Sequence, residues 1–158
     1  MNKVYLLLGG NLSDPVQQLS IAREKIGEIA EIILKSCIYQ TKAWGKTDQP
    51  DFLNQALLVH TEHGPEETLH ELLSIELDMG RARSEKNAPR LIDIDILFFN
   101  ASIINKRNLS IPHPHIASRR FVLVPLAEIA PSFIHPVYTL TIDELLKQCS
   151  DPLQVKRY

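Results

Sequence analysis

The sequence predicts an α/β fold of the α+β type, in a single three-layer domain that spans residues 1–158. A chain of 158 residues has the usual length of one domain, and 44% apolar with 23% charged residues is ordinary globular composition. Short apolar runs typical of buried strands alternate with segments in which apolar residues recur at helical spacing. Together these observations exclude a disordered chain.

Local signals mark the first strand and the first helix. Residues 4–8 form an apolar run that ends at Gly9-Gly10-Asn11, which predicts a buried strand followed by a turn. Asp14 and Pro15 supply an N-cap and a first-turn proline, and apolar residues then recur at helical spacing. We therefore expect a helix over residues 15–29.

Two strands and a second helix follow. Residues 32–44 are rich in β-branched and aromatic types and predict a long strand, whereas the polar residues 45–51 predict a loop. Residues 52–61 predict another strand. A second helix begins at Gly64-Pro65, and its apolar pattern continues to Met79.

A charged loop over residues 81–90 leads into LIDIDILFFN, residues 91–100, which is the clearest strand of the sequence. Residues 103–104 predict a short strand. The segment 112–115 cannot be regular structure, because proline removes a donor and restricts the residue before it. Two more helices are expected at the C-terminal end, over residues 119–130 and 142–149.

The order of these elements through residue 100 is strand–helix–strand–strand–helix–strand. This is the βαββαβ pattern of ferredoxin-like domains, in which the helices cover one face of an antiparallel-containing sheet. The C-terminal helices are additional to this core and complete the three layers.

The charge total and the cysteines narrow the classes of function. A formal net charge of −2, from 17 basic and 19 acidic side chains, argues against a protein that binds nucleic acid or another long polyanion. A small anionic ligand is compatible with this total, because charge can be segregated locally. Cys37 and Cys149 match no CxxC or zinc-ligand spacing, which favours a cytoplasmic location. The apolar run at residues 4–8 is too short for a signal peptide or a membrane span, so no membrane partner is expected.

Asp93 and Asp95 alternate with isoleucines along the clearest strand, so the two carboxylates share one face. Two residues along a strand span about 6.6 Å, and carboxylates at this separation repel each other unless a positive charge lies between them. Mg²⁺ is commonly held by one or two carboxylates together with substrate phosphates. The alternative is an amphipathic strand whose acidic face is only solvated.

Basic side chains and histidines precede and follow this strand. Those before it are Arg81, Arg83, Lys86 and Arg90, and those after it are Arg107, His113, His115, Arg119 and Arg120. Because arginine binds phosphate oxygens bidentately, an acid pair between basic loops predicts a Mg²⁺–polyphosphate site. A solvated run of charge is one alternative, and a transition-metal site at His113 and His115 is another. Neither GxxxxGK[ST] nor GxGxxG occurs, so a nucleotide would be held by side chains and metal.

An aromatic ring and an amide share one face of a predicted strand. Phe52 and Asn54 alternate onto the same side, and Phe121 could supply a second ring. A stacking ring beside a hydrogen-bonding amide suits a flat heterocycle. The alternative is that both phenylalanines belong to the core.

Four segments carry a more specific signal: LLLGGNL, QPDFLNQAL, RARSEKNAPRLIDIDILFF and SIPHPHIASRRFVLVPLAEIAP, which together span residues 6–131. In this order and spacing they resemble the 6-hydroxymethyl-7,8-dihydropterin pyrophosphokinase family of the folate pathway. The resemblance implies a catalytic domain that transfers diphosphate from ATP to the pterin alcohol and releases AMP. It also implies ATP as co-substrate and two Mg²⁺ ions held by Asp93 and Asp95, and a cytoplasmic monomer is expected.

The resemblance implies roles for individual side chains. Catalytic positions of the family correspond to Arg81, Arg90, Asp93 and Asp95. Nucleotide-binding positions correspond to Glu76, Arg83, Ile96, Ser110, His113 and Arg119. Pterin-binding positions correspond to Thr41, Ala43, Gln49, Phe52, Asn54 and Phe121.

The chain departs from some members of the family near the nucleotide and in the charged loop. Some members have a tryptophan and a glycine before the Pro-Arg that precedes the acidic strand, whereas this chain has Asn87-Ala88-Pro89-Arg90 and a loop that is one residue shorter. Leu73 replaces a glutamine, and Asn108 replaces an arginine. Two other functions compete: a metal-dependent phosphohydrolase that uses the same aspartates with His113 and His115, and a non-catalytic ligand sensor of the same fold.

Overall fold

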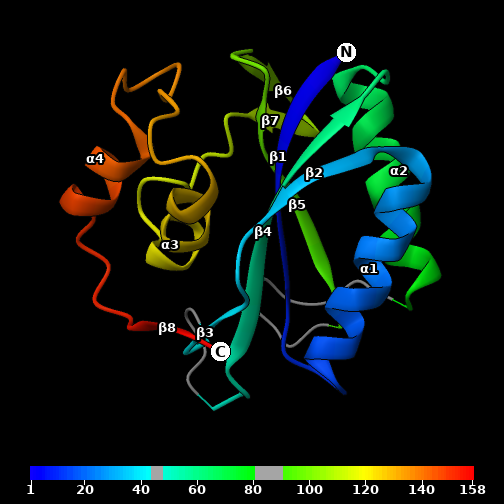
Figure 1. The fold of residues 1–158 in the computed structure, drawn as a ribbon, viewed down its shortest axis with the longest axis horizontal. Helices are drawn as coiled ribbons and strands as arrows, with labels where there is room; N and C mark the ends of the chain where they lie inside the picture. Colours follow the sequence, from blue (N-terminus) through cyan, green and yellow to red (C-terminus); the bar gives the residue numbers. More distant parts are fainter. Residues whose placement is uncertain (44–47, 81–90) are drawn as a thin grey trace.

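A six-stranded antiparallel sheet separates helices α1 and α2 from helices α3 and α4 in the computed structural model, which describes residues 1–43, 48–80 and 91–158 (Figure 1). The helices are α1 (Pro15–Ile29), α2 (Pro65–Asp78), α3 (Arg120–Ile129) and α4 (Ile142–Gln148). The strands are β1 (Asn2–Gly10), β2 (Glu31–Lys35), β3 (Tyr39–Thr41), β4 (Phe52–Thr61), β5 (Asp93–Phe99), β6 (Ile104–Lys106), β7 (Leu109–Ile111) and β8 (Val155–Arg157). These elements form the predicted three layers.

The order of strands confirms the ferredoxin-like core. The main sheet runs β5-β1-β4-β3-β8, and β2 also pairs with β4. The central strands β1 and β4 pair along the whole length of β1, from Asn2 opposite Thr61 to Gly10 opposite Leu53. Helix α1 follows β1 and helix α2 follows β4, and both pack on the same face of the sheet (Figure 1).

Side chains on the two faces of the sheet form two separate apolar clusters. Leu6 and Leu8 of β1 pack toward α1 and α2, while Leu7 packs toward α3 and α4. Strand β5 divides in the same way, with Ile94 in the first cluster and Leu97 in the second. Burial on both faces explains why the first strand is apolar without alternation.

The first strand is longer than predicted. β1 continues through Gly9 and Gly10, which pair with Asn54 and Leu53 of β4 instead of forming a turn. The helix after it begins where expected, because the Asp14 carboxylate accepts a hydrogen bond from the Gln17 N–H at 3.2 Å and Pro15 occupies the first turn.

The predicted long strand over residues 32–44 is wrong as a single element, because β2 ends at Lys35 and β3 begins at Tyr39. At the break, the Ser36 hydroxyl accepts a hydrogen bond from the Ala56 N–H at 2.9 Å, in a place where a backbone carbonyl would continue the ladder. The Cys37 N–H turns away to the Glu128 carboxylate on α3. The end of the predicted strand, at Trp44, lies outside the described residues.

Short strands complete the structure. The predicted strand at 103–104 is the start of a hairpin in which β6 pairs with β7. The C-terminal strand β8, which local pattern did not predict, pairs with β3 so that Thr41 lies opposite Val155. No helix in the described part of the chain is long and apolar enough to span a membrane.

Candidate active site

Two pockets meet at the acidic strand β5. The Asn54 pocket is lined by Leu7, Gly9, Thr41, Lys42, Phe52, Asn54, Asp93, Asp95, Arg119 and Phe121. The Ser110 pocket is lined by Leu69, Leu73, Glu76, Asp93, Ile94, Asp95, Ile96, Lys106, Arg107, Asn108, Leu109, Ser110, His113 and Pro114. Asp93 and Asp95 are the lining residues that both pockets share, so the carboxylate pair lies at their junction.

Strand register places the carboxylates, as the alternation in the sequence predicts. Asp93 lies opposite Gly9 of β1, and Asp95 lies opposite Leu7. Ile94 and Ile96 point into the core beneath α1 and α2, which leaves both aspartates on the opposite face. The predicted shared face of the two carboxylates is therefore confirmed.

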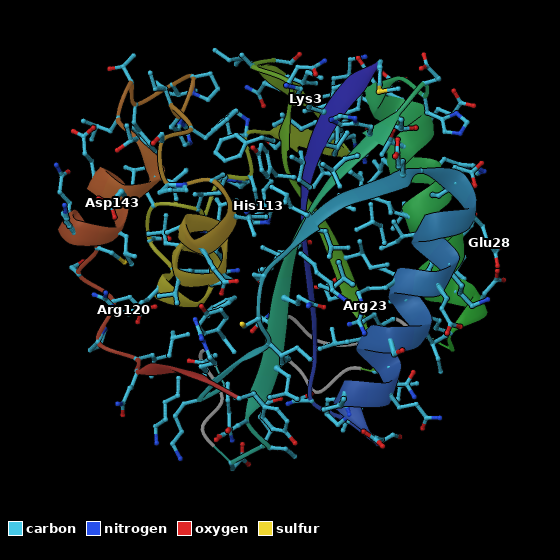
Figure 2. All side chains as sticks on the ribbon, in the orientation of Figure 1. Lys3, Arg23, Glu28, His113, Arg120 and Asp143 are labelled. Carbon is cyan, nitrogen blue, oxygen red and sulfur yellow. The ribbon has the colours of Figure 1, made fainter. Side chains whose placement is uncertain are left out.

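His113 lies on the side of the sheet that α3 covers (Figure 2). The backbone N–H of His113 donates to the Leu97 carbonyl of β5 at 3.0 Å. Its ring Nε2 lies 4.0 Å from Asp95 Oδ2. Burial, reinforced by the charges of Arg119 and His115, lowers the pKa of His113 to about 4, against a weaker raising effect of Asp93. Its Nδ1 accepts the His115 N–H at 3.1 Å, so the neutral ring carries its proton on Nε2, which faces Asp95.

The donor set at the junction suits a hard cation. Among the described residues no three His, Cys, Asp or Glu side chains gather as a complete metal cage. Two carboxylates on one face fit Mg²⁺, which takes its remaining oxygens from water and phosphate. The transition-metal alternative at His113 and His115 finds less support, because His113 Nδ1 already accepts a backbone N–H.

The Asn54 pocket joins aromatic walls to a buried amide. Phe52 of β4 and Phe121 of α3 both line it. Asn54 is 5% exposed, and its Oδ1 is buried with no hydrogen-bond partner among residues 1–43, 48–80 and 91–158. A buried acceptor in this state is costly unless a ligand donor reaches it. The geometry therefore favours a flat ligand with a polar N–H edge.

The two neighbouring arginines at the start of α3 differ. Arg119 lines the Asn54 pocket, with its guanidinium carbon 5.8 Å from the centre of the Phe121 ring. Arg120 points away from the sheet (Figure 2), and its guanidinium donates to the carbonyls of Asp151 and Cys149 at 3.1 and 2.8 Å. Of this pair, Arg119 therefore faces the pocket, whereas Arg120 binds backbone carbonyls near the C-terminal end.

Helix α3 is capped from a distant part of the chain. Its N-cap residue, Arg119, makes no side-chain cap. Instead Asp151, which is 5% exposed, accepts the Arg120 N–H at 2.9 Å through Oδ2 and the Leu153 N–H at 3.0 Å through Oδ1. This remote carboxylate therefore replaces the usual cap and lets an arginine occupy the N-cap position beside the pocket.

Asp151→Ala is expected to lower the free energy of unfolding by about 1–2 kcal/mol, as for the loss of an N-cap. Urea denaturation measures this change. The matched control is Asp78→Ala, because Asp78 is exposed in the last turn of α2, where a negative charge opposes the helix dipole. Equal destabilisation by the two substitutions would contradict the capping role.

Glu76, predicted to bind the nucleotide, is a buried side chain. It is 2% exposed, and its Oε1 accepts the Ile94 N–H at 2.7 Å. Glu76 thus binds β5, the end strand of the main sheet, between the two aspartates, and it also lines the Ser110 pocket. Its immediate structural effect is to hold the acidic strand in place.

The remaining predicted positions are those that line a pocket, those that line neither pocket, and those outside the described residues. Ile96 and Ser110 line the Ser110 pocket, and Thr41 lines the Asn54 pocket although its hydroxyl donates to the Gln154 carbonyl at 3.0 Å. Ala43 and Gln49 line neither pocket, and Gln49 Oε1 instead accepts from Asn11 Nδ2 at 2.9 Å. The predicted Arg81, Arg83 and Arg90, together with Lys86, lie outside the described residues.

Some lining residues were not predicted as site residues. Gly9 and Lys42 line the Asn54 pocket, and Lys106 lines the Ser110 pocket while it pairs with Glu66. The strand register that brings Gly9 opposite Asn54 depends on residues far apart in the sequence, so no local signal marked it. Lys42 could have been predicted as a site residue, because it lies between Thr41 and Ala43, which were both predicted as pterin-binding positions.

The sequence model of the 7,8-dihydro-6-hydroxymethylpterin-pyrophosphokinase (HPPK) family matches residues 5–131. The chain belongs to this family. Relatives named 2-amino-4-hydroxy-6-hydroxymethyldihydropteridine pyrophosphokinase include one from Aquifex aeolicus, 40% identical over 144 residues, which cover 91% of this chain and 90% of the relative. Another, from Haemophilus influenzae, is 38% identical over 158 residues, which cover 99% and 98% of the two chains.

Solved structures support the fold. A crystal structure of Plasmodium falciparum HPPK-DHPS matches with a TM-score of 0.79 and 21% identity, and covers 93% of this chain and 45% of that chain. The wild-type form of that protein matches with a TM-score of 0.75. The chain therefore spans less than half the length of these solved chains.

Members of the HPPK family transfer diphosphate from ATP to the pterin in folate biosynthesis. As a member, the chain is a pyrophosphoryl transferase of that pathway, which favours this reaction over the hydrolase and sensor alternatives. The family match begins and ends within one residue of the four segments that carried the resemblance.

Proposed function

We propose that residues 1–158 act as one catalytic domain, with the pterin in the Asn54 pocket and ATP in the Ser110 pocket. The observation that carries this proposal is that the two pockets share Asp93 and Asp95 as lining residues. An acceptor in one pocket and a phosphate chain in the other can meet only where the pockets join. A cytoplasmic monomer stays a prediction.

The reaction is a displacement at the β-phosphorus of ATP. The hydroxymethyl oxygen of 6-hydroxymethyl-7,8-dihydropterin forms a bond to this phosphorus, the bond from it to the oxygen shared with the α-phosphorus breaks, and AMP leaves. The hydroxyl proton is released. Such a transfer depends on positioning and on stabilisation of charge, with little covalent chemistry for the protein itself.

Two Mg²⁺ ions held by Asp93 and Asp95 would supply alignment and neutralisation of the phosphate oxygens. The aspartates contribute fixed negative charge at the junction, on a strand that Glu76 holds through the Ile94 N–H. Arg119 brings positive charge to the Asn54 pocket. Neutral His113 can donate one hydrogen bond from Nε2 without adding charge.

The pterin is proposed to lie between Phe52 and Phe121, with a ring N–H donating to Asn54 Oδ1. The two phenylalanines line the same pocket, and the amide oxygen is buried without a hydrogen-bond partner in the described part of the chain. Stacking and one hydrogen bond to a buried acceptor together suit a flat, polar-edged ring.

The nucleotide base is proposed to contact an apolar wall of the Ser110 pocket made by Leu69 and Leu73 of α2. Leu73, which replaces the glutamine of some family members, is 46% exposed at this wall. Lys106 and Arg107 add positive charge at the same pocket. In this proposal Arg107, together with Lys106, which also pairs with Glu66, favours a phosphate chain that runs toward the aspartates.

The protein, ATP, Mg²⁺ and 6-hydroxymethyl-7,8-dihydropterin are incubated together, and nucleotide products are separated by chromatography. We expect AMP and the pterin diphosphate in equal amounts, and only when all components are present. Formation of ADP, or release of phosphate from ATP without the pterin, would contradict the proposed reaction.

A second test asks whether His113 Nε2 donates a hydrogen bond to ATP. His113→Gln places an amide nitrogen near the position of Nε2, whereas His113→Asn places one near Nδ1. We expect His113→Gln to raise the KM for ATP less than about fivefold and His113→Asn to raise it about tenfold or more, as for loss of a hydrogen bond to a charged group. Equal KM values for the two variants would contradict a donor role for Nε2.

A further inference from the structure

We infer that Gly9 is a positioning residue for the pterin, because its missing side chain leaves the space that the Asn54 amide occupies. This inference rests on the proposed function of the Asn54 pocket. It assigns a role to a residue whose sequence context predicts only a turn.

Gly9 lies between the two halves of the site. In the sheet it is opposite Asn54 of β4 on one side and opposite Asp93 of β5 on the other. All three residues line the Asn54 pocket. A pterin that hydrogen-bonds to Asn54 and reacts beside Asp93 must therefore pass over the backbone of Gly9.

A methyl group at Gly9 has no room while Asn54 keeps its place. An ideal Cβ on Gly9 would lie 2.3 Å from Asn54 Nδ2 and 3.4 Å from Asn54 Cγ. The next nearest atom, the Leu53 carbonyl oxygen, would be 3.6 Å away, which is ordinary contact. The conflict is thus confined to one side chain, and glycine within a strand commonly marks such a close approach.

The side chain that would have to yield is the proposed pterin contact. The Asn54 amide is buried, and Nδ2 faces the Leu8 carbonyl at 3.4 Å, so the amide is directed by its surroundings. Rotation away from a methyl at position 9 would remove Oδ1 from its place in the pocket. The backbone ladder between β1 and β4 would remain, because it does not depend on this amide.

The expected consequence is selective loss of pterin binding. Gly9→Ala should raise the Kd for 6-hydroxymethyl-7,8-dihydropterin about 10- to 100-fold, as for one hydrogen bond to a buried acceptor. The Kd for ATP with Mg²⁺ should change less than about twofold, because Gly9 does not line the Ser110 pocket. A general loss of structure would weaken both ligands.

A double-mutant cycle with Asn54 isolates the contact. In the Asn54→Ala background the added methyl meets nothing closer than the Leu53 oxygen, so Gly9→Ala should change pterin binding less than about threefold there. Gly27→Ala is the matched control, because it adds the same methyl on the exposed face of α1, where no described atom outside the local helix backbone lies within 4 Å. This control should bind both ligands as the parent chain does.

Titration calorimetry with the pterin, and separately with ATP and Mg²⁺, measures all four members of the cycle and the control. Unchanged pterin binding by Gly9→Ala, an equal effect in both Asn54 backgrounds, or an equal loss of ATP binding would each overturn the inference. If the parent chain fails to bind the pterin or to form AMP, the proposed function itself is wrong. The two failures are therefore distinguishable.

Discussion

Asp95→Asn is expected to lower kcat for AMP formation at least about a hundredfold, comparable to losing a major electrostatic contact at the reacting group. Asp93→Asn is expected to have an effect of the same size. Asparagine keeps the shape of each side chain and removes its charge. The strand register that opposes Asp93 to Gly9 and Asp95 to Leu7 is made by the backbone and should persist.

A second readout separates metal binding from loss of structure. Mg²⁺-dependent binding of ATP, followed by calorimetry, should weaken in both variants while their thermal unfolding stays near that of the parent chain. Asp143→Asn is the control, because Asp143 pairs with Lys147 on α4 and lines neither pocket. Near-parental kcat in Asp95→Asn would contradict the proposed role of the pair.

Arg119→Ala is expected to lower kcat/KM about a hundredfold, with most of the change in kcat. The reason is that a preorganised cation beside the carboxylate junction stabilises charge that develops on transferring phosphate. Arg119→Lys should recover only part of the loss, because a point charge cannot reproduce the planar fork of the guanidinium. Steady-state rates of AMP formation measure both effects.

The adjacent arginine supplies a matched control for this experiment. Arg120→Ala removes donors to the carbonyls of Asp151 and Cys149 and should lower the free energy of unfolding by about 1–2 kcal/mol. Its kcat/KM should stay within about threefold of the parent value. Similar kinetic losses in the two variants would contradict the assignment of Arg119, and not Arg120, to the phosphates.

Features that depend on neighbouring residues were predictable from the sequence. The alternation of Asp93 and Asp95 with isoleucines placed both carboxylates on one face before any strand partner was known. Asp14 and Pro15 defined the start of α1, and the strand predicted over residues 52–61 matches β4. In each case the signal and the structure lie within a few residues of each other.

Features that depend on distant partners were not predictable in the same way. The break between β2 and β3 requires the Ser36 hydroxyl to meet the Ala56 N–H and the Cys37 N–H to meet Glu128. Strand β8 exists because the C-terminal segment reaches the edge of β3. The composition of these segments does not predict such contacts, because strand pairing between remote residues is decided by tertiary packing.

The functional site also combines features that depend on local sequence with features that depend on distant residues. By itself the sequence determined the acid pair, the surrounding positive charge and the family, because these reside in residue types and their spacing. Only the tertiary structure decided that Arg119 faces the pocket while Arg120 binds the backbone near Asp151, and that Gly9 leaves space for Asn54. Which of two like residues meets a ligand depends on side-chain direction and on contacts from remote strands. These become fixed only when the sheet and its helices pack together.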